Sequence, residues 1–211
     1  MKRPTRLLLA AAGLALGAMG AAAGPADAQI EGDCTATVAG RDVETATSPS
    51  SAIEVGADDV VRVEGVDPNG APFTVIELRF PPLPAFEVYT EEHDAADPSW
   101  GGEVNVADYA AYGVGLYQVS GSTDDCRGTA WIKVTGRSPF TTVAGGIGTA
   151  LAAAGAIGAG ISIARAQPGW RSFFRSASRG ALLGVGVAIL AQQFALTPLT
   201  GLALAGWVGA G

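Results

Sequence analysis

The last third of the chain constrains the fold most, because it contains very few charged residues. Residues 140–164 are uncharged, and so are residues 180–211; between them, residues 165–179 hold four arginines and no acid. A helix over 140–164 would be about 37 Å long, enough to cross a hydrocarbon layer of about 30 Å. We therefore expect a hairpin of two transmembrane helices, the first over 140–164 and the second within 180–211, a range that also includes a short outer tail.

Small residues on the first of these segments suggest how it packs. Gly146, Ala150, Ala154 and Gly158 recur at every fourth position. Small residues at this spacing let the backbones of membrane helices approach closely. The alternative is that a chain rich in glycine and alanine produces such a stripe by composition. We expect the stripe to pack against a helix of the same chain, of a second copy or of another membrane protein.

The second segment carries two amides. Gln192 and Gln193 fall near the middle of a span that begins at Ala181. A side-chain amide in hydrocarbon is costly unless it is paired, so these two should face another helix.

Both ends of the chain indicate the same orientation. Residues 1–28 have a basic start, a short apolar core and the pattern Ala26-Asp27-Ala28 that is typical of a cleaved secretory signal. Such a signal exports the domain behind it, and the arginines of 165–179, mixed with aromatic residues, mark the cytoplasmic side. The prediction is a multi-pass protein of the cytoplasmic membrane, in contact with lipid, with its N-terminal domain outside and the loop 165–179 inside.

The region between signal and hairpin, residues 29–139, is acidic. It holds 19 acidic and six basic residues. Nucleic-acid binding requires a basic face on the folded part, so nucleic acid is excluded as a partner. About 110 residues suffice for one domain with its own core.

The two cysteines of this exported region lie near its two ends. Cys34 and Cys126 are most simply one disulfide, which would close a long loop and stabilise the domain by about 4 kcal/mol in the chain-entropy model. Two isolated cysteines do not make a structural zinc site, which takes four ligands at close spacing.

Short strands alternate with turn residues throughout the acidic region. The pattern predicts strands at 35–38, 52–55, 60–66, 73–80, 86–90, 103–106, 113–120 and 127–135. Asp67-Pro68-Asn69-Gly70 is a turn sequence and should join 60–66 to 73–80 as a hairpin. We expect an antiparallel β-sandwich that resembles immunoglobulin-like domains in architecture, although its cysteines do not match the usual inter-sheet pair.

Residues that could carry chemistry are few. Around the only histidine lie Glu91, Glu92, His93, Asp94 and Asp97, which form a solvated acidic loop or, as the alternative, a metal or partner site. No nucleophile motif, metalloprotease motif or phosphate loop is present. We therefore expect no enzyme and no cofactor, but a membrane-held binding or interaction module at the cell surface. The alternative is an accessory subunit of a larger membrane complex that docks through its Gly/Ala-rich helices.

Overall fold

The computed structural model describes residues 30–70, 73–79, 85–92, 98–123, 126–164 and 170–198. The expected signal peptide and outer tail lie outside these residues. The chain divides into two compact units. One contains residues 26–149 together with 189–198; the other contains 150–188 with the two chain ends.

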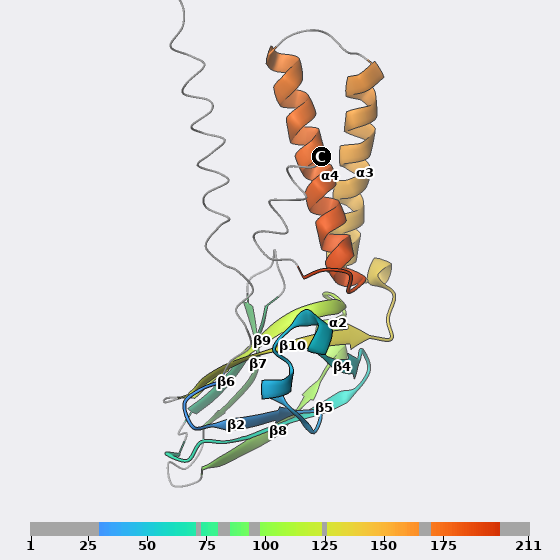
Figure 1. Cartoon of the computed structure of the whole chain (residues 1–211). Helices are drawn as coiled ribbons and strands as arrows, with labels where there is room; N and C mark the ends of the chain where they lie inside the picture. Colours follow the sequence, from blue (N-terminus) through green and yellow to red (C-terminus); the bar gives the residue numbers. More distant parts are fainter. Residues whose placement is uncertain are drawn as a thin grey trace, which may run out of the picture. The chain divides into compact units, whose positions relative to one another are not determined.

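The first unit is built from two β-sheets (Figure 1). One is a mixed sheet in which β1, β10, β9, β6 and β7 follow one another and β4 also pairs with β10; the other runs β3, β2, β5, β8. The strands of the first sheet are β1 (Ile30–Glu31), β4 (Ile53–Gly56), β6 (Phe73–Arg79), β7 (Ala85–Glu92), β9 (Gly115–Ser122) and β10 (Arg127–Thr135). Those of the second are β2 (Thr35–Val38), β3 (Arg41–Asp42), β5 (Val60–Val66) and β8 (Ser99–Asn105).

Alternation of apolar and polar residues determines which face of each strand is buried. In β5, Val61, Val63 and Gly65 point inward, whereas Val60 and Val66 are exposed. Successive strand residues face opposite sides of a sheet, so this pattern buries one face only. The sequence predicted β2, β5 and β10 with the observed ends and located every other predicted strand within a few residues.

Two expectations about strand pairing are wrong. The turn at Asp67–Gly70 forms, with the Gly70 amide 3.0 Å from the Asp67 carbonyl, but β5 pairs with β2 and β8 and does not pair with β6. The turn thus carries the chain from one sheet to the other. The fold is also not purely antiparallel, because β4 runs parallel to β10, with Ile53 opposite Ile132.

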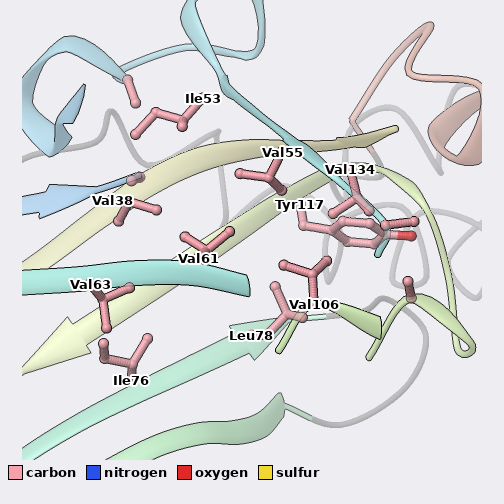
Figure 2. Packing of buried hydrophobic residues seen from close by; sticks show 14 of the residues in the cluster. Val38, Ile53, Val55, Val61, Val63, Ile76, Leu78, Val106, Tyr117 and Val134 are labelled. Atoms are coloured by element: carbon pink, nitrogen blue, oxygen red, sulfur yellow. The ribbon is translucent and has the colours of Figure 1, made fainter. Parts of the chain in front are cut away.

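The core lies between the two sheets (Figure 2). Valines of one sheet, such as Val38 and Val63, face Ile76 and Leu78 of the other. Among the residues whose burial is described, Tyr117 is the largest fully buried side chain, at 1 % exposure. Short helical segments complete the unit: η1 (Val43–Thr45), η2 (Pro49–Ser51), α2 (Ala107–Ala110) and η3 (Pro139–Thr141).

The second unit is made of two helices, α3 (Val143–Ala164) and α4 (Trp170–Gln193), which contribute their residues 150–164 and 170–188 to it. A Cβ atom added at Gly155 would clash with the backbone of Leu183, and one at Gly158 would lie 2.8 Å from the Cγ of Arg179. Gly155 lies against Leu183, and Gly158, which comes later in α3, lies against Arg179, which comes earlier in α4. The two helices are therefore antiparallel. Glycine is required at Gly155, where the backbones approach too closely for a side chain, whereas at Gly158 the neighbouring atoms belong to the flexible side chain of Arg179.

The hairpin differs from the expectation in its second helix. Helix α4 begins at Trp170, within the segment expected to be a loop, and ends at Gln193. Only 12 uncharged residues, 180–191, separate Arg179 from Gln192. As a helix they measure about 18 Å, short of the roughly 30 Å of a hydrocarbon core. Among the described residues, one helical stretch is long and apolar enough to cross a membrane, Val143–Ile161, with a mean hydropathy of 1.5.

Candidate functional site

At the last turn of α4, the side chain of Gln193 forms a buried cluster of hydrogen bonds with residues of the β unit. Gln193 donates from Nε2 to the Tyr117 hydroxyl at 2.7 Å. Its Oε1 accepts from the Val114 amide at 2.8 Å and from Thr142 Oγ1 at 3.3 Å. Gln193 is 3 % exposed, so its amide has exchanged water for these three partners. We call these residues, together with Gln192, the amide cluster.

Gln192 extends the amide cluster along β9. Its Nε2 donates to the Leu116 carbonyl at 2.9 Å. Gly115, with φ of +98°, allows this close approach, because a Cβ there would collide with the Gln192 carbonyl. The Gln192 Oε1 is buried, and no described atom forms a hydrogen bond with it. The sequence suggested that Gln192 and Gln193 face another helix in mid-membrane; the described bonds run to the β unit instead.

Burial determines the acidity of Tyr117. Desolvation raises the pKa of its hydroxyl far above the ordinary tyrosine value, and the hydrogen bond from Gln193 opposes this only in part. The same hydroxyl donates to the Val114 carbonyl. Tyr117 therefore stays neutral and acts as both donor and acceptor. The sequence did not single out Tyr117, Val114 or Thr142, because nothing local marks a residue whose partner lies between 51 and 79 positions away.

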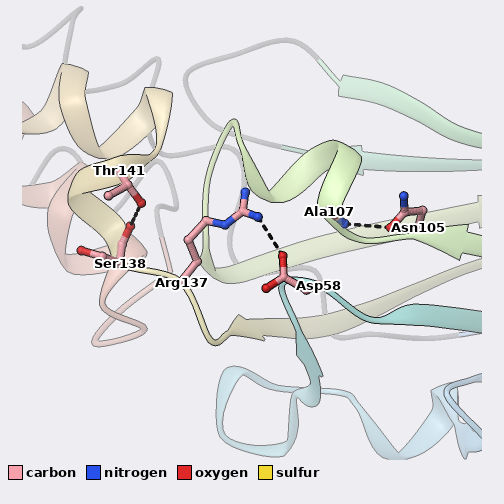
Figure 3. Close-up of polar contacts among 6 residues, drawn as sticks. All are labelled: Asp58, Asn105, Ala107, Arg137, Ser138 and Thr141. Carbon is pink, nitrogen blue, oxygen red and sulfur yellow. Dashed lines mark hydrogen bonds and ion pairs between the residues drawn. The ribbon is translucent and has the colours of Figure 1, made fainter.

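The connector from β10 into α3 is bonded to the β unit at several points (Figure 3). Arg137 forms an ion pair with Asp58 at 2.8 Å. Thr141 Oγ1 donates to the Ser138 carbonyl at 2.7 Å within η3. The first amides of α3, those of Val143 and Ala144, donate to carbonyls of the segment that follows α2. These bonds satisfy N–H groups that a helix start leaves unpaired.

The predicted disulfide is confirmed. Cys34 and Cys126 are bonded, with their Cα atoms 6.3 Å apart and 92 positions apart in sequence. The carboxylate of Asp67 lies within 4.8 Å of both sulfurs and is fully buried. Thr123 joins the two features: its Oγ1 donates to Asp67 Oδ2 at 2.7 Å and accepts from the Cys126 amide at 3.1 Å. Since both sulfurs are oxidised, this group offers no thiolate to a metal.

The acidic candidate segment is only partly described. Glu91 and Glu92 are the last residues of β7, so their side chains point to opposite faces of the sheet and do not converge. The Tyr89 hydroxyl donates to Glu91. Burial, this bond and the adjacent negative charge raise the pKa of Tyr89. His93, Asp94 and Asp97 lie outside the described residues.

The residues of the predicted helix-packing stripe have different surroundings. Gly158 contacts Arg179, whose guanidinium donates to the Gly158 carbonyl at 3.0 Å. At Gly146, an added Cβ would meet no described atom within 4 Å. Ala150 and Ala154 are exposed. The close helix contact is at Gly155, one position from the predicted stripe, and Ala150 and Ala154 are left open.

No protein-family model matches the chain, and no curated protein matches it. Three solved structures are detectably similar. A lytic polysaccharide monooxygenase from Jonesia denitrificans has 9 % identity over 40 % of this chain and 56 % of its own, with a TM-score of 0.27. An LPMO from Kitasatospora papulosa has 12 % identity over 41 % and 52 %, with a TM-score of 0.31. A third LPMO, solved with zinc, has 11 % identity and a TM-score of 0.28.

This similarity corrects one expectation and supports no conclusion about a reaction or a substrate. The chain spans about half the length of the solved proteins it is similar to. At such identities and TM-scores the likeness says nothing about a reaction or a substrate of this chain. However, the similar structures are all enzymes, which contradicts the expectation that the chain is not one. That expectation is withdrawn.

Proposed function

We propose that the β unit is an extracytoplasmic binding or interaction module that α3 holds at the membrane. The observation that carries this proposal is the succession of a disulfide-closed β unit and, seven residues after β10, an apolar helix long enough to span. Disulfides form in oxidising compartments outside the cytoplasm. The expected signal sequence at residues 1–28 supports the same location.

Helix α4 has a specific place in this proposal. It packs against α3 through Gly155 and Gly158, and its arginines 171, 175 and 179 lie at its first three turns. Arginine side chains can extend along a helix to reach the headgroup region. We propose that α4 returns beside α3, with the arginines toward the cytoplasm and Gln193 back in the exported β unit.

Thiol labelling of intact cells tests this topology. The native cysteines are bonded to each other, so a single introduced cysteine reports alone. Ser178→Cys, on α4, should react with a membrane-impermeant maleimide only after the cells are opened. Ser138→Cys, an exposed position before α3, is the matched control and should react in intact cells. Labelling of Ser178→Cys in intact cells, or release of the chain by alkaline carbonate, would overturn the proposal.

A second candidate function rests on the open face of α3. Ile157 is 65 % exposed, and the neighbouring small residues Gly146, Ala150 and Ala154 leave room for another backbone. We propose as the alternative that this face docks on a partner helix in a larger membrane complex. Crosslinking in membranes through Ala154→Cys should then capture a partner. Ala152→Cys, at a half-buried position, is the control and should capture no partner. Recovery of only uncrosslinked chain from Ala154→Cys would exclude docking through this face.

A further inference from the structure

We infer that the space between the two sheets of the β unit binds one unbranched hydrocarbon chain. The core contains two cavities, of about 70 Å³ and about 90 Å³. They share four walls: Val38 and Val63 of one sheet, and Ile76 and Val119 of the other. The two cavities are therefore neighbours between the sheets, and we call the space that they occupy the inter-sheet slot; Figure 2 labels three of the shared residues, Val38, Val63 and Ile76.

The walls of the inter-sheet slot decide the chemistry of its occupant. Among the described residues that line the larger cavity, all side chains are aliphatic except that of Tyr109, which alone carries a polar group. The hydroxyl of Tyr109 points to the Val88 carbonyl at 3.4 Å. A polar ligand, or a peptide with its backbone, would lose its bonds to water and gain none here. Water itself needs two to four polar partners, which this cavity does not offer.

Size and shape favour a linear chain. Packed sheets lie about 10 Å apart, so the space that side chains leave between them is thin. Together the two cavities are comparable to an apolar cavity of roughly 150 Å³, which stays dry and binds benzene. A single alkyl chain is thin enough to extend from one cavity into the other if the shared side chains of Val63 and Ile76 move apart, whereas a bulky fused ring system needs more width.

The two ends of the inter-sheet slot differ in polarity. The cavity near the disulfide includes Thr35, Ser122 and Arg127, all exposed, whereas the described lining of the other cavity is mainly aliphatic. The polar end of an amphiphile would thus lie at the disulfide end, in contact with water. The register of β1 and β10 pairs residue 127 with residue 31, so a basic and an acidic position of the sequence stand opposite each other at that end. The slot therefore recognises the hydrocarbon chain of its ligand, and the inference does not specify the charge of the ligand's head group.

The inference rests on the proposed function in one respect, namely that a domain held at a bilayer has acyl chains within reach. The full chain, reconstituted in phosphatidylcholine nanodiscs, is exposed to a diazirine-bearing palmitate and irradiated, and labelled peptides are mapped. Label is expected on β2, β5, β6 and β9, which supply the four shared walls. Unlabelled dodecanoate and dodecanol should both reduce labelling by the palmitate probe, because the slot binds the hydrocarbon chain that all three share.

A matched pair of substitutions on β5 makes the test specific. Val63→Phe fills the slot and should abolish strand labelling, whereas Val66→Phe, on the exposed face of the same strand, should leave it unchanged. Should Val63→Phe fail to fold, Val63→Ala widens the slot and should retain or increase labelling. Label confined to α3 and α4, or strand labelling indifferent to Val63→Phe, would overturn the inference. Strand labelling of a chain that carbonate releases from membranes would keep the inference and reject the membrane proposal.

Discussion

The side-chain amide of Gln193 donates to the hydroxyl of Tyr117 at 2.7 Å, although 76 positions separate the two residues. Tyr117 belongs to β9 and Gln193 is the last residue of α4. Gln193 also accepts from the Val114 amide, so one side chain fills a donor and an acceptor position in the β unit. The end of α4 is thus a structural part of the β unit, and that unit is not complete at residue 139.

Replacing Gln193 should destabilise the β unit. Gln193→Leu keeps the approximate size but leaves the buried Val114 amide without an acceptor, which costs about 1–3 kcal/mol. Urea unfolding of the full chain, followed by tryptophan fluorescence, measures this loss. Leu196→Ala is the control, because Leu196 is 74 % exposed and should change little. Equal midpoints for Gln193→Leu and the unaltered chain would show that the amide cluster does not stabilise the fold.

Tyr117 should make the stability depend on alkaline pH. Its pKa is raised in the folded state by burial, so above pH about 10 the unfolded chain binds fewer protons than the folded one. The stabilisation is complete below the pKa of the unfolded chain and is lost as pH rises through the folded pKa. Tyr117→Phe should flatten this alkaline decline in unfolding free energy. An unchanged slope would show that Tyr117 does not titrate on unfolding.

How far the sequence predicts this fold depends on the range of the interaction. Strands such as β5 and β10 follow from local alternation, and their ends agree with the structure. The pairing partners of β5 do not follow from local alternation, because the Asp67–Gly70 turn sequence is compatible with either a hairpin or a crossing between sheets. What selects the crossing is distant: the Asp67 carboxylate bonds Thr123, and the Asp67 amide bonds the Pro98 carbonyl.

The amides of α4 illustrate the same limit at the candidate site. Gln192 and Gln193 are conspicuous in an apolar segment, so the sequence identified them as buried and paired. Their partners could not be predicted, because periodicity on a helix says which face is polar and not what lies against it. The disulfide was predictable because a domain that the sequence predicts to be exported, with only two cysteines, has one possible pairing.

The close contact of α3 with α4 should be sensitive to a single methyl group. Gly155→Ala places a Cβ against the backbone of Leu183, which cannot move as a side-chain end could. Overpacking of this kind costs about 1–3 kcal/mol. Gly160→Ala is the control on the same helix, since nothing described lies within 4 Å of its Cβ position. Disulfide trapping of a cysteine pair across α3 and α4 should fall for Gly155→Ala only; equal trapping would exclude tight packing at Gly155.

The disulfide should contribute a large part of the stability of the β unit. Joining residues 92 positions apart removes conformational entropy from the unfolded state, which stabilises the fold by about 4–5 kcal/mol in the chain-entropy model. The double variant Cys34→Ser with Cys126→Ser should therefore unfold at much lower urea. Quantitative thiol labelling of the unaltered, unfolded chain should find no free thiol, and two labelled thiols per exported chain would contradict the bond.

Thr123 should matter beyond its size, because it joins the buried carboxylate of Asp67 to the backbone beside the disulfide. Thr123→Val keeps the shape but removes the donor from a buried, charged acceptor, a loss of about 1.5–3 kcal/mol. Thr135→Val is the matched control, since Thr135 Oγ1 makes one long bond of 3.4 Å to the Val55 carbonyl. Urea unfolding of the two variants should separate them clearly. If both lose the same small amount, Asp67 has enough support from the Asn69 amide at 3.1 Å, and the Thr123 bridge is not a source of stability.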